Sequence, residues 1–254
     1  RFYVEGGGPR ALVVYVGGSK IGASAERRSW FKVLGCEKGY EGKLAELIRY
    51  VESILRDEGS DYVYIYAYAP WYLTAGIDSR YSRYVELLEG LGYEVSSREV
   101  DYIVDMENFF TPSHMERTVE RLIKAGYSIR SAERSEQERI SSWIGRVFST
   151  GWALEASIAL RRDYGGVIIA EKSGEIVGFS VYGPMAPYRF GPIGVHPQHR
   201  GLGIGDVLLF KTLEEMKLLG NRYAVIPWTS HLHFYAGVPG IYRLRKFYVY
   251  RKKL

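Results

Sequence analysis

Hydrophobic and polar positions recur along this chain in two periods, one typical of helices and one typical of strands. Leu44, Leu47, Ile48, Val51 and Leu55 have helical spacing, which predicts an amphipathic helix at residues 44–56. Other predicted helices cover residues 81–90, 114–125, 136–148, 152–162, 206–219 and 230–236. Apolar and β-branched runs predict strands at 11–16, 61–69, 92–105, 127–131, 166–171, 175–183, 189–195, 222–228 and 242–251. This alternation of helices and strands is typical of an α/β (α+β) protein.

Some segments are less regular. Residues 17–39 are rich in Gly, Ser and Arg and carry no predicted element, and Pro70 is predicted to end the strand at 61–69. Residues 92–105 fit either one long strand or a pair of strands.

A domain boundary is predicted where the pattern breaks after residue 105. Asn108 and Pro112 interrupt it, and Ser113 followed by Glu116 is a capping-box pattern that starts a new helix. We therefore predict two domains, at residues 1–108 and 109–254.

Composition narrows the class of protein. The 254 residues are 46% hydrophobic, which is enough for a sizeable core, and no apolar run approaches the length of a membrane span. A single cysteine, Cys36, excludes an internal disulfide and favours a reducing, cytoplasmic compartment. The net charge of +5 is spread among acidic residues, so we expect neither a nucleic-acid nor a membrane partner. Scarce Asn, Gln and Cys resemble the composition of a thermophile's protein.

The strongest chemical signal is a glycine-rich turn between the strand ending at Val195 and the helix beginning near Asp206. Its glycines, at 201, 203 and 205, permit close backbone approach and place N–H groups at the positive end of a helix. Such a turn binds an anion. It lacks the Gly-Lys-Ser/Thr ending of a Walker loop and the Gly-x-Gly-x-x-Gly spacing of a dinucleotide site.

Arg200-x-x-Gly203-x-Gly205, preceded by Val195-x-Pro197, resembles the Gln/Arg-x-x-Gly-x-Gly/Ala signature of the GCN5-related N-acetyltransferase (GNAT) superfamily. The resemblance implies the GNAT fold, in which helices flank a mixed central sheet. It also implies acetyl-CoA as cofactor, with its pyrophosphate on the loop and its pantetheine arm beside the preceding strand. Pro192 suits a bulge in that strand. The cofactor-binding residues that it implies are Ile193, Gly194, Val195, Arg200, Gly201, Leu202, Gly203, Ile204, Gly205 and Tyr235.

The same resemblance assigns catalytic roles. It implies that the N–H of Ile193 polarises the thioester carbonyl and that Tyr235 protonates the leaving thiolate. Relatives often place an Asn seven residues before this tyrosine, but Trp228 stands there. The resemblance assigns no general base, and the candidates are Glu155, His196, His231 and His233. His231-x-His233 offers too few ligands for a metal, and none is predicted.

The first half of the chain resembles a partial copy of the second. Residues 38–44, a helix, Gly59 and the strand from Asp61 can be laid on residues 200–206, a helix, Gly220 and the strand from Asn221. Glu41 replaces the glycine opposite Gly203, and a carboxylate there would repel phosphate. We expect a truncated GNAT-like half, without the strands that normally precede this unit, that has lost cofactor binding.

Three functions follow as hypotheses. The first is an acetyl-CoA-dependent N-acetyltransferase in which a primary amine, on a small molecule or a peptide N-terminus, attacks the thioester directly. The second is a non-catalytic acyl-CoA-binding or sensing protein, and the third is a related acyl or aminoacyl transfer with another donor. We expect a monomer or homodimer. The residues expected near the acceptor are Trp152, Tyr182, Met185, Tyr188, Arg189 and Phe190.

Overall fold

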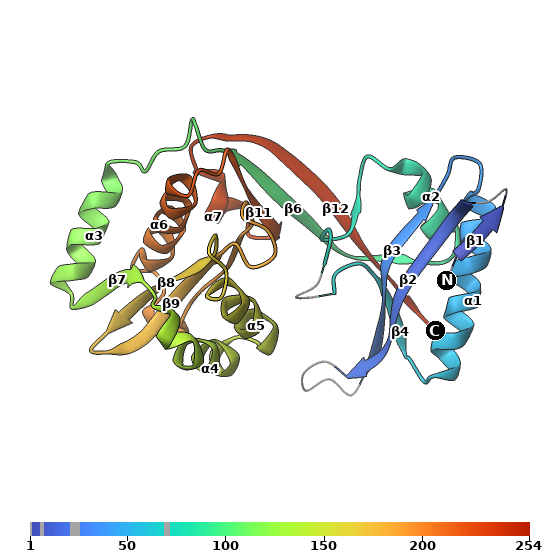
Figure 1. Ribbon diagram of the computed structural model, residues 1–254, viewed down its shortest axis with the longest axis horizontal. Coiled ribbons are helices and arrows are strands. Elements are labelled where there is room, and N and C mark those ends of the chain that lie inside the picture. Colours follow the sequence, from blue (N-terminus) through green and yellow to red (C-terminus); the bar gives the residue numbers. More distant parts are fainter. Residues whose placement is uncertain (1, 6–7, 21–25, 69–71) are drawn as a thin grey trace. The chain divides into compact units, whose positions relative to one another are not determined.

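The computed structural model describes residues 2–5, 8–20, 26–68 and 72–254. The chain divides into two compact units, residues 1–100 with 245–254 (unit 1) and residues 101–244 (unit 2). Two strands, β6 (Glu94–Asp105) and β12 (Ile241–Lys253), belong partly to each unit (Figure 1). No helix among the described residues has the length and hydrophobicity needed to span a membrane.

Unit 1 is built around a sheet with the strand order β1-β2-β3-β4-β12. Strands β1, β2 and β3 pair antiparallel, whereas β3 and β4 run parallel because helix α1 carries the chain back between them. The C-terminal strand β12 pairs antiparallel with β4, through residues 251–253 against 62–64. The bounds are β1 (Phe2–Glu5), β2 (Gly8–Lys20), β3 (Arg27–Cys36), α1 (Glu41–Asp57), β4 (Tyr62–Ile65), β5 (Ile77–Asp78) and α2 (Ser82–Gly90).

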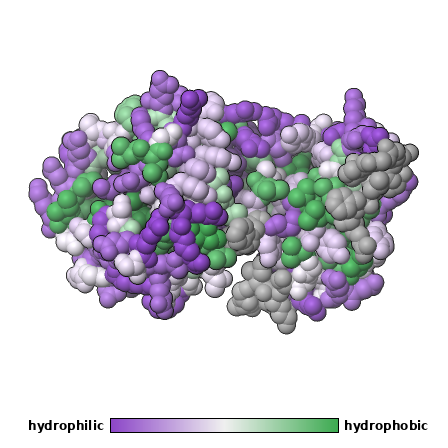
Figure 2. Space-filling view, in the orientation of Figure 1, coloured by the Kyte–Doolittle hydropathy of each residue, from purple (hydrophilic) through white to green (hydrophobic). Residues whose placement is uncertain are grey.

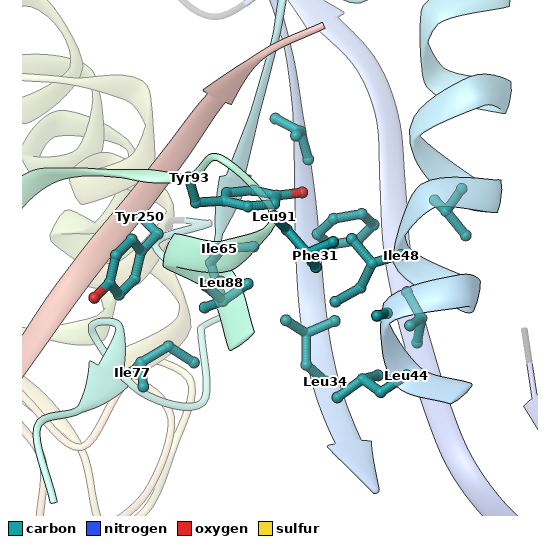
Figure 3. Packing of buried hydrophobic residues seen from close by; sticks show 14 of the residues in the cluster. Phe31, Leu34, Leu44, Ile48, Ile65, Ile77, Leu88, Leu91, Tyr93 and Tyr250 are labelled. Atoms are coloured by element: carbon teal, nitrogen blue, oxygen red, sulfur yellow. The ribbon is translucent and has the colours of Figure 1, made fainter. Parts of the chain in front are cut away.

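The predicted amphipathic face of α1 forms one side of the unit 1 core. Leu44, Ile48, Val51 and Leu55 are fully buried, and each contributes about 1.5–3 kcal/mol of transfer free energy. Figure 3 shows Leu44 and Ile48 facing the sheet, with Tyr250 of β12 in the same cluster. Unit 1 thus completes its core with the last strand of the chain.

The prediction was wrong over residues 17–39, which include the ten-residue strand β3. Trp30 and Phe31 are consecutive and both buried, so the strand does not alternate with a period of two. Its partner β2 is also irregular, with register shifts after Val14 and Val16. Because β1, β2 and β3 precede α1, the expectation that this half lacks the strands that normally precede the unit is wrong as well.

Strand β4 is shorter than the strand predicted at 61–69. It ends at Ile65 because Tyr66 and Ala67 have positive φ angles of 58° and 51°, which lie outside the β region. Pro70, which we expected to end this strand, lies outside the described residues.

Unit 2 follows the predicted order closely, and β6 is the single long strand of the two alternatives. The bounds are α3 (His114–Lys124), β7 (Tyr127–Ser131), η1 (Arg134–Glu136), α4 (Gln137–Val147), α5 (Thr150–Ala159), β8 (Gly166–Lys172), β9 (Glu175–Tyr182), β10 (Phe190–Val195), η2 (Pro197–His199), α6 (Ile204–Leu218), β11 (Tyr223–Thr229) and α7 (Leu232–Ala236). The predicted mixed sheet flanked by helices is therefore confirmed.

The sheet of unit 2 opens between two neighbouring strands. Strand β10 ends the antiparallel series β10-β9-β8-β7, whereas β11 pairs with β6. Among the described residues, β10 and β11 are linked by one parallel bridge, Arg189–Val225, at the start of β10. The two strands therefore diverge toward the end of β10, where the glycine-rich turn begins.

Candidate functional site

The glycine-rich turn has the backbone conformation that an anion site requires. Gly201 and Gly203 have φ angles of 77° and 87°, a region that L-residues with a side chain rarely adopt. Gly203 is the N-cap of α6, which starts at Ile204. Ile204 is buried, so its side chain faces the core. The first-turn N–H groups of α6 lack helical partners and lie at the positive end of its dipole.

Other parts of unit 2 hold the turn in place. Arg200 Nε donates a 3.0 Å hydrogen bond to the carbonyl of Val195, so this side chain folds back onto β10. Tyr127 Oη lies 2.9 Å from His199 Nδ1. Arg121 Nη2, on α3, donates a 3.1 Å hydrogen bond to the carbonyl of Leu202. No local pattern in the sequence indicates Arg121, because about 80 residues separate it from the turn.

The strand that precedes the turn offers a backbone edge. Ile193, Gly194 and Val195 pair with β9, and the register shifts between Phe190 and Ile193, next to a cis Gly191–Pro192 peptide. This irregularity is the bulge expected at Pro192. Because β10 ends its sheet, its other side faces the opening toward β11.

An aromatic cluster next to Gly194 leaves no room for a side chain at this position. A Cβ at this position would lie 2.7 Å from the ring of Phe148, which packs with Trp152 and Phe179. Trp152, expected near the acceptor, is therefore part of a packed cluster on one face of the sheet.

Tyr235 lies where β10, the turn and α7 meet. Its ring is 6.3 Å from that of Phe190 at the start of β10 and 4.8 Å from that of Phe234. A Cβ placed on Gly205 would be 3.4 Å from Phe234, so α7 packs close to the turn. Tyr235 is buried, and burial raises the pKa of its hydroxyl, which keeps it protonated as a donor at neutral pH.

Glu155 is the buried carboxylic acid of this region. It lies on α5, which packs against β8, β9 and β10, and its side chain is 7% exposed. Burial raises the pKa of Glu155 to about 7, while the positive charge of Arg189 acts in the opposite direction. A carboxyl with this pKa can exchange a proton near neutral pH.

The three histidines considered as alternative bases lie next to Tyr235 or next to the turn in the sequence. His231 and His233 are exposed at the start of α7, and His196 Nδ1 accepts a 3.4 Å hydrogen bond from the backbone of Gln198. Within the described residues, no three His, Cys, Asp or Glu side chains gather in a way that could hold a metal ion.

Trp228, at the position where an Asn was expected, has an unusual backbone. Its φ angle is 48°, in the left-handed region, which costs of order 1–3 kcal/mol for a residue with a large side chain. Its N–H donates a 2.9 Å hydrogen bond to Asp101 Oδ1 at the start of the unit 2 part of β6. Asp101 is buried and was not predicted to act here.

The remaining residues expected near the acceptor have mixed surroundings. Tyr182 and Phe190 are buried, whereas Tyr188 is exposed and stacks on Tyr223 with ring centroids 5.0 Å apart. Figure 2 shows hydrophilic residues over much of the visible surface, interrupted by small hydrophobic patches.

Unit 1 repeats the strand–turn–helix–strand arrangement of the site. Gly39 and Gly59 flank α1 with φ angles of 91° and 78°, and the matched glycines Gly201 and Gly220 have 77° and 81°. The key difference lies at Glu41, whose Oε2 accepts a 2.8 Å hydrogen bond from the N–H of Gly39. The Glu41 carboxylate therefore already accepts the hydrogen bond that the Gly39 N–H could otherwise donate to a ligand.

The strand edge in unit 1 is closed as well. Strands β3 and β4 pair over four residues, whereas β10 and β11 share one bridge. Beyond this pairing, Tyr66 Oη lies within hydrogen-bond distance of both the N–H and the carbonyl of Leu34. Tyr84 Oη has the same relation to Cys36. Side chains of unit 1 thus contact the backbone at the end of β3, the strand that leads into the turn.

Comparison with known proteins agrees with this geometry. Residues 163–238 match the family model of the acetyltransferase (GNAT) domain, a stretch that includes the turn, Ile193 and Tyr235. A comparison with curated proteins found no match.

Solved structures share the fold over nearly the whole chain. A GCN5-related glucosamine N-acetyltransferase region of a fungal multi-domain GH3 β-N-acetylglucosaminidase has a TM-score of 0.75 and 15% identity over 95% of this chain, which spans 31% of the fungal one. A tandem GNAT protein from the clavulanic acid biosynthesis pathway has a TM-score of 0.63 and 11% identity. The match covers 98% of this chain and 81% of the tandem GNAT protein. A GCN5-related N-acetyltransferase from Sphaerobacter thermophilus gives 0.64 and 15%, covering 97% and 78%.

These likenesses confirm the resemblance found in the Arg200–Gly205 motif. At such identities the solved structures establish the fold, and the family model identifies the domain. Residues 163–238 therefore match the acetyltransferase domain of the GNAT superfamily, within a chain whose fold is similar to that of a tandem GNAT protein.

Proposed function

We propose that this protein is an acetyl-CoA-dependent N-acetyltransferase whose active site lies in unit 2. The observation that carries the proposal is the convergence of the Gly201–Gly203 turn, the edge strand β10 and Tyr235. The acceptor is a primary amine, on a small molecule or at a peptide N-terminus.

The residues of the site fit acetyl-CoA. Two glycines with positive φ angles and the start of α6 suit a diphosphate, and Ile193–Val195 offer backbone groups to an extended pantetheine arm. When bound, acetyl-CoA supplies an activated acetyl group as a thioester. Arg200 supports this arrangement by holding the carbonyl of Val195 at the end of the strand.

Each proposed catalytic residue has one task. Glu155 removes a proton from the acceptor ammonium, whose deprotonation at pH 7 costs about 4 kcal/mol for an amine of pKa about 10. The N–H of Ile193 stabilises negative charge on the carbonyl oxygen. Tyr235 gives its proton to the departing sulfur, and the resulting tyrosinate takes up the proton that the nitrogen loses as the amide forms. Burial raises the pKa of Tyr235, so its hydroxyl is protonated at neutral pH.

A panel of primary amines tests the activity directly, with release of free thiol as the signal. We expect turnover with at least one amine, and the Tyr235→Phe variant should still bind acetyl-CoA but turn over at least about tenfold more slowly. Tight binding without turnover on any amine would instead support the non-catalytic acyl-CoA-binding protein, which Trp228 in place of an Asn favours.

We propose a different role for the first half of the chain. Residues 1–108 are a degenerate GNAT-like half, and residues 109–254 are the acetyltransferase domain. Glu41 at the turn and Tyr66 at the strand edge support this assignment, because both contact backbone that a cofactor would need. One equivalent of acetyl-CoA should therefore bind per chain, and a stoichiometry of two would contradict the assignment.

A further inference from the structure

Helix α3 contacts the glycine-rich turn at two adjacent residues. Arg121 Nη2 donates a 3.1 Å hydrogen bond to the carbonyl of Leu202. One turn earlier on α3, Thr118 packs against Gly203. A Cβ added to Gly203 would lie only 2.8 Å from the Thr118 methyl group. Met115 and Leu122, one turn before and one turn after Thr118 on the same face of the helix, are buried and anchor α3.

The hydrogen bond from Arg121 fixes the orientation of a whole peptide unit. The carbonyl of Leu202 and the N–H of Gly203 belong to one planar peptide unit, and in a trans unit they point to opposite sides. The cis peptide of the described chain is elsewhere, at Gly191–Pro192. A carbonyl held toward Arg121 therefore turns the Gly203 N–H away from α3.

The peptide needs such a restraint. Gly201 and Gly203 flank Leu202, and glycine adopts either sign of φ at little cost, so the 202–203 peptide can rotate between two orientations. In one orientation it presents an N–H at the start of α6, and in the other it presents a carbonyl oxygen, which repels an anion.

We propose that Arg121 is a positioning residue, which orients the Leu202–Gly203 peptide so that the Gly203 N–H is available to the diphosphate of the cofactor. The inference rests on the proposed function, since it concerns the same turn. Arg121 acts through the Leu202 carbonyl, and Thr118 limits the movement of Gly203 by direct packing.

The orientation of this peptide can be measured without any ligand. Labelling with ¹³C-carbonyl leucine and ¹⁵N-glycine selects amide signals of glycines that follow leucine, namely Gly35, Gly92, Gly203 and Gly220. In Arg121→Ala we expect the Gly203 signal to shift or split, while the other three stay in place and report an intact fold. An unchanged Gly203 signal would overturn the proposal.

Binding provides the second readout, with calorimetric titration of CoA and of pantetheine, which lacks the diphosphate. We expect Arg121→Ala to weaken CoA binding by about tenfold and to leave pantetheine binding unchanged. Arg121→Lys, which keeps a donor and the charge, should recover part of the loss. Lys124→Ala removes one exposed positive charge from the same helix and should change the CoA affinity by less than about twofold.

Two results would contradict the positioning role. Equal losses in Arg121→Ala and Lys124→Ala would show that α3 acts only through its charge. Equal losses for CoA and pantetheine would show a general disturbance of the site. If the wild type bound no CoA, the proposed function would fail, and the Gly203 signal would still decide whether Arg121 orients the turn.

Discussion

Tyr102 and Tyr235 lie with their ring centroids 6.1 Å apart, and Tyr102 Oη donates a 3.0 Å hydrogen bond to the carbonyl of Leu232 at the start of α7. The tyrosine proposed as proton donor is thus supported by a residue of β6, the strand that precedes the predicted domain boundary. Tyr102 is buried, so its hydroxyl has this carbonyl as partner in place of water.

Replacing Tyr102 with Phe tests this support. The ring remains while the hydrogen bond is lost, so we expect the unfolding free energy to fall by about 1 kcal/mol. Turnover should drop several-fold as α7 loosens, while CoA affinity stays constant. Steady-state kinetics and chemical denaturation measure both effects, with the exposed Tyr242→Phe as control. Unchanged turnover in Tyr102→Phe would show that the Tyr102 hydrogen bond does not contribute to the site.

Glu155 predicts a pH dependence of turnover. With a pKa of about 7, the carboxylate that accepts the proton forms as the pH rises through 7, so kcat/KM should rise over the same range. Glu155→Gln should lower kcat/KM and remove this rise. A profile that keeps its inflection in the variant would assign the base to another residue.

Ionisation of Glu155, which should increase turnover, should lower the stability of the fold. The folded-state pKa of Glu155 lies above the unfolded value of about 4.3, so the folded protein binds more protons between these values. The unfolding free energy should therefore fall as the pH rises from about 4 to 7, by an order of 2–3 kcal/mol. Denaturation of the wild type and Glu155→Gln across this range should show a smaller decrease in the variant.

Tyr250 predicts how much unit 1 depends on the end of the chain. Its side chain is fully buried, and its hydroxyl donates a 3.0 Å hydrogen bond to Glu89 on α2. Tyr250→Ala should lower the unfolding free energy by about 3–5 kcal/mol through the cavity that it leaves. Tyr250→Phe should cost only about 1 kcal/mol. An alanine variant as stable as the phenylalanine variant would mean that β12 is dispensable for the unit 1 core.

Glu136 predicts a stability effect at low pH. It lies 2.7 Å from Arg130 Nη1 and 3.0 Å from Arg139 Nη1, and its hydrogen bond to Arg130 helps to lower its pKa to about 2. A lowered carboxyl pKa stabilises the fold above the unfolded value of about 4.3, and this contribution is lost as the pH falls toward 2. Glu136→Gln should be less stable by about 1–2 kcal/mol at pH 7. A stability difference that persists at pH 2 would contradict this origin.

The sequence predicted the site best where the chemistry is local. The strand, turn and helix from Phe190 to Leu218 are contiguous, and glycine spacing with helical periodicity identified them. Arg121 and Tyr102 were not predicted, because their contacts join segments about 80 and 130 residues apart. A single sequence carries no sign of such pairs.

In unit 1 the prediction succeeded for α1 and failed for β3. The buried face of α1 repeats with helical spacing, which a sequence displays directly. The residues around Trp30 and Phe31 are polar and glycine-rich, so their sequence does not predict a strand. Strand β3 is stabilised by pairing with β2 and β4.

The most direct test of the account is calorimetric titration of the purified protein with acetyl-CoA, at low and high salt, beside the Gly203→Glu variant. We predict micromolar binding of one equivalent per chain, weaker at high salt, and none in the variant, because a glutamate would add both a clash with Thr118 and a negative charge at the turn. No binding by the wild type, or equal binding by the variant, would contradict the assignment of this turn as the cofactor site.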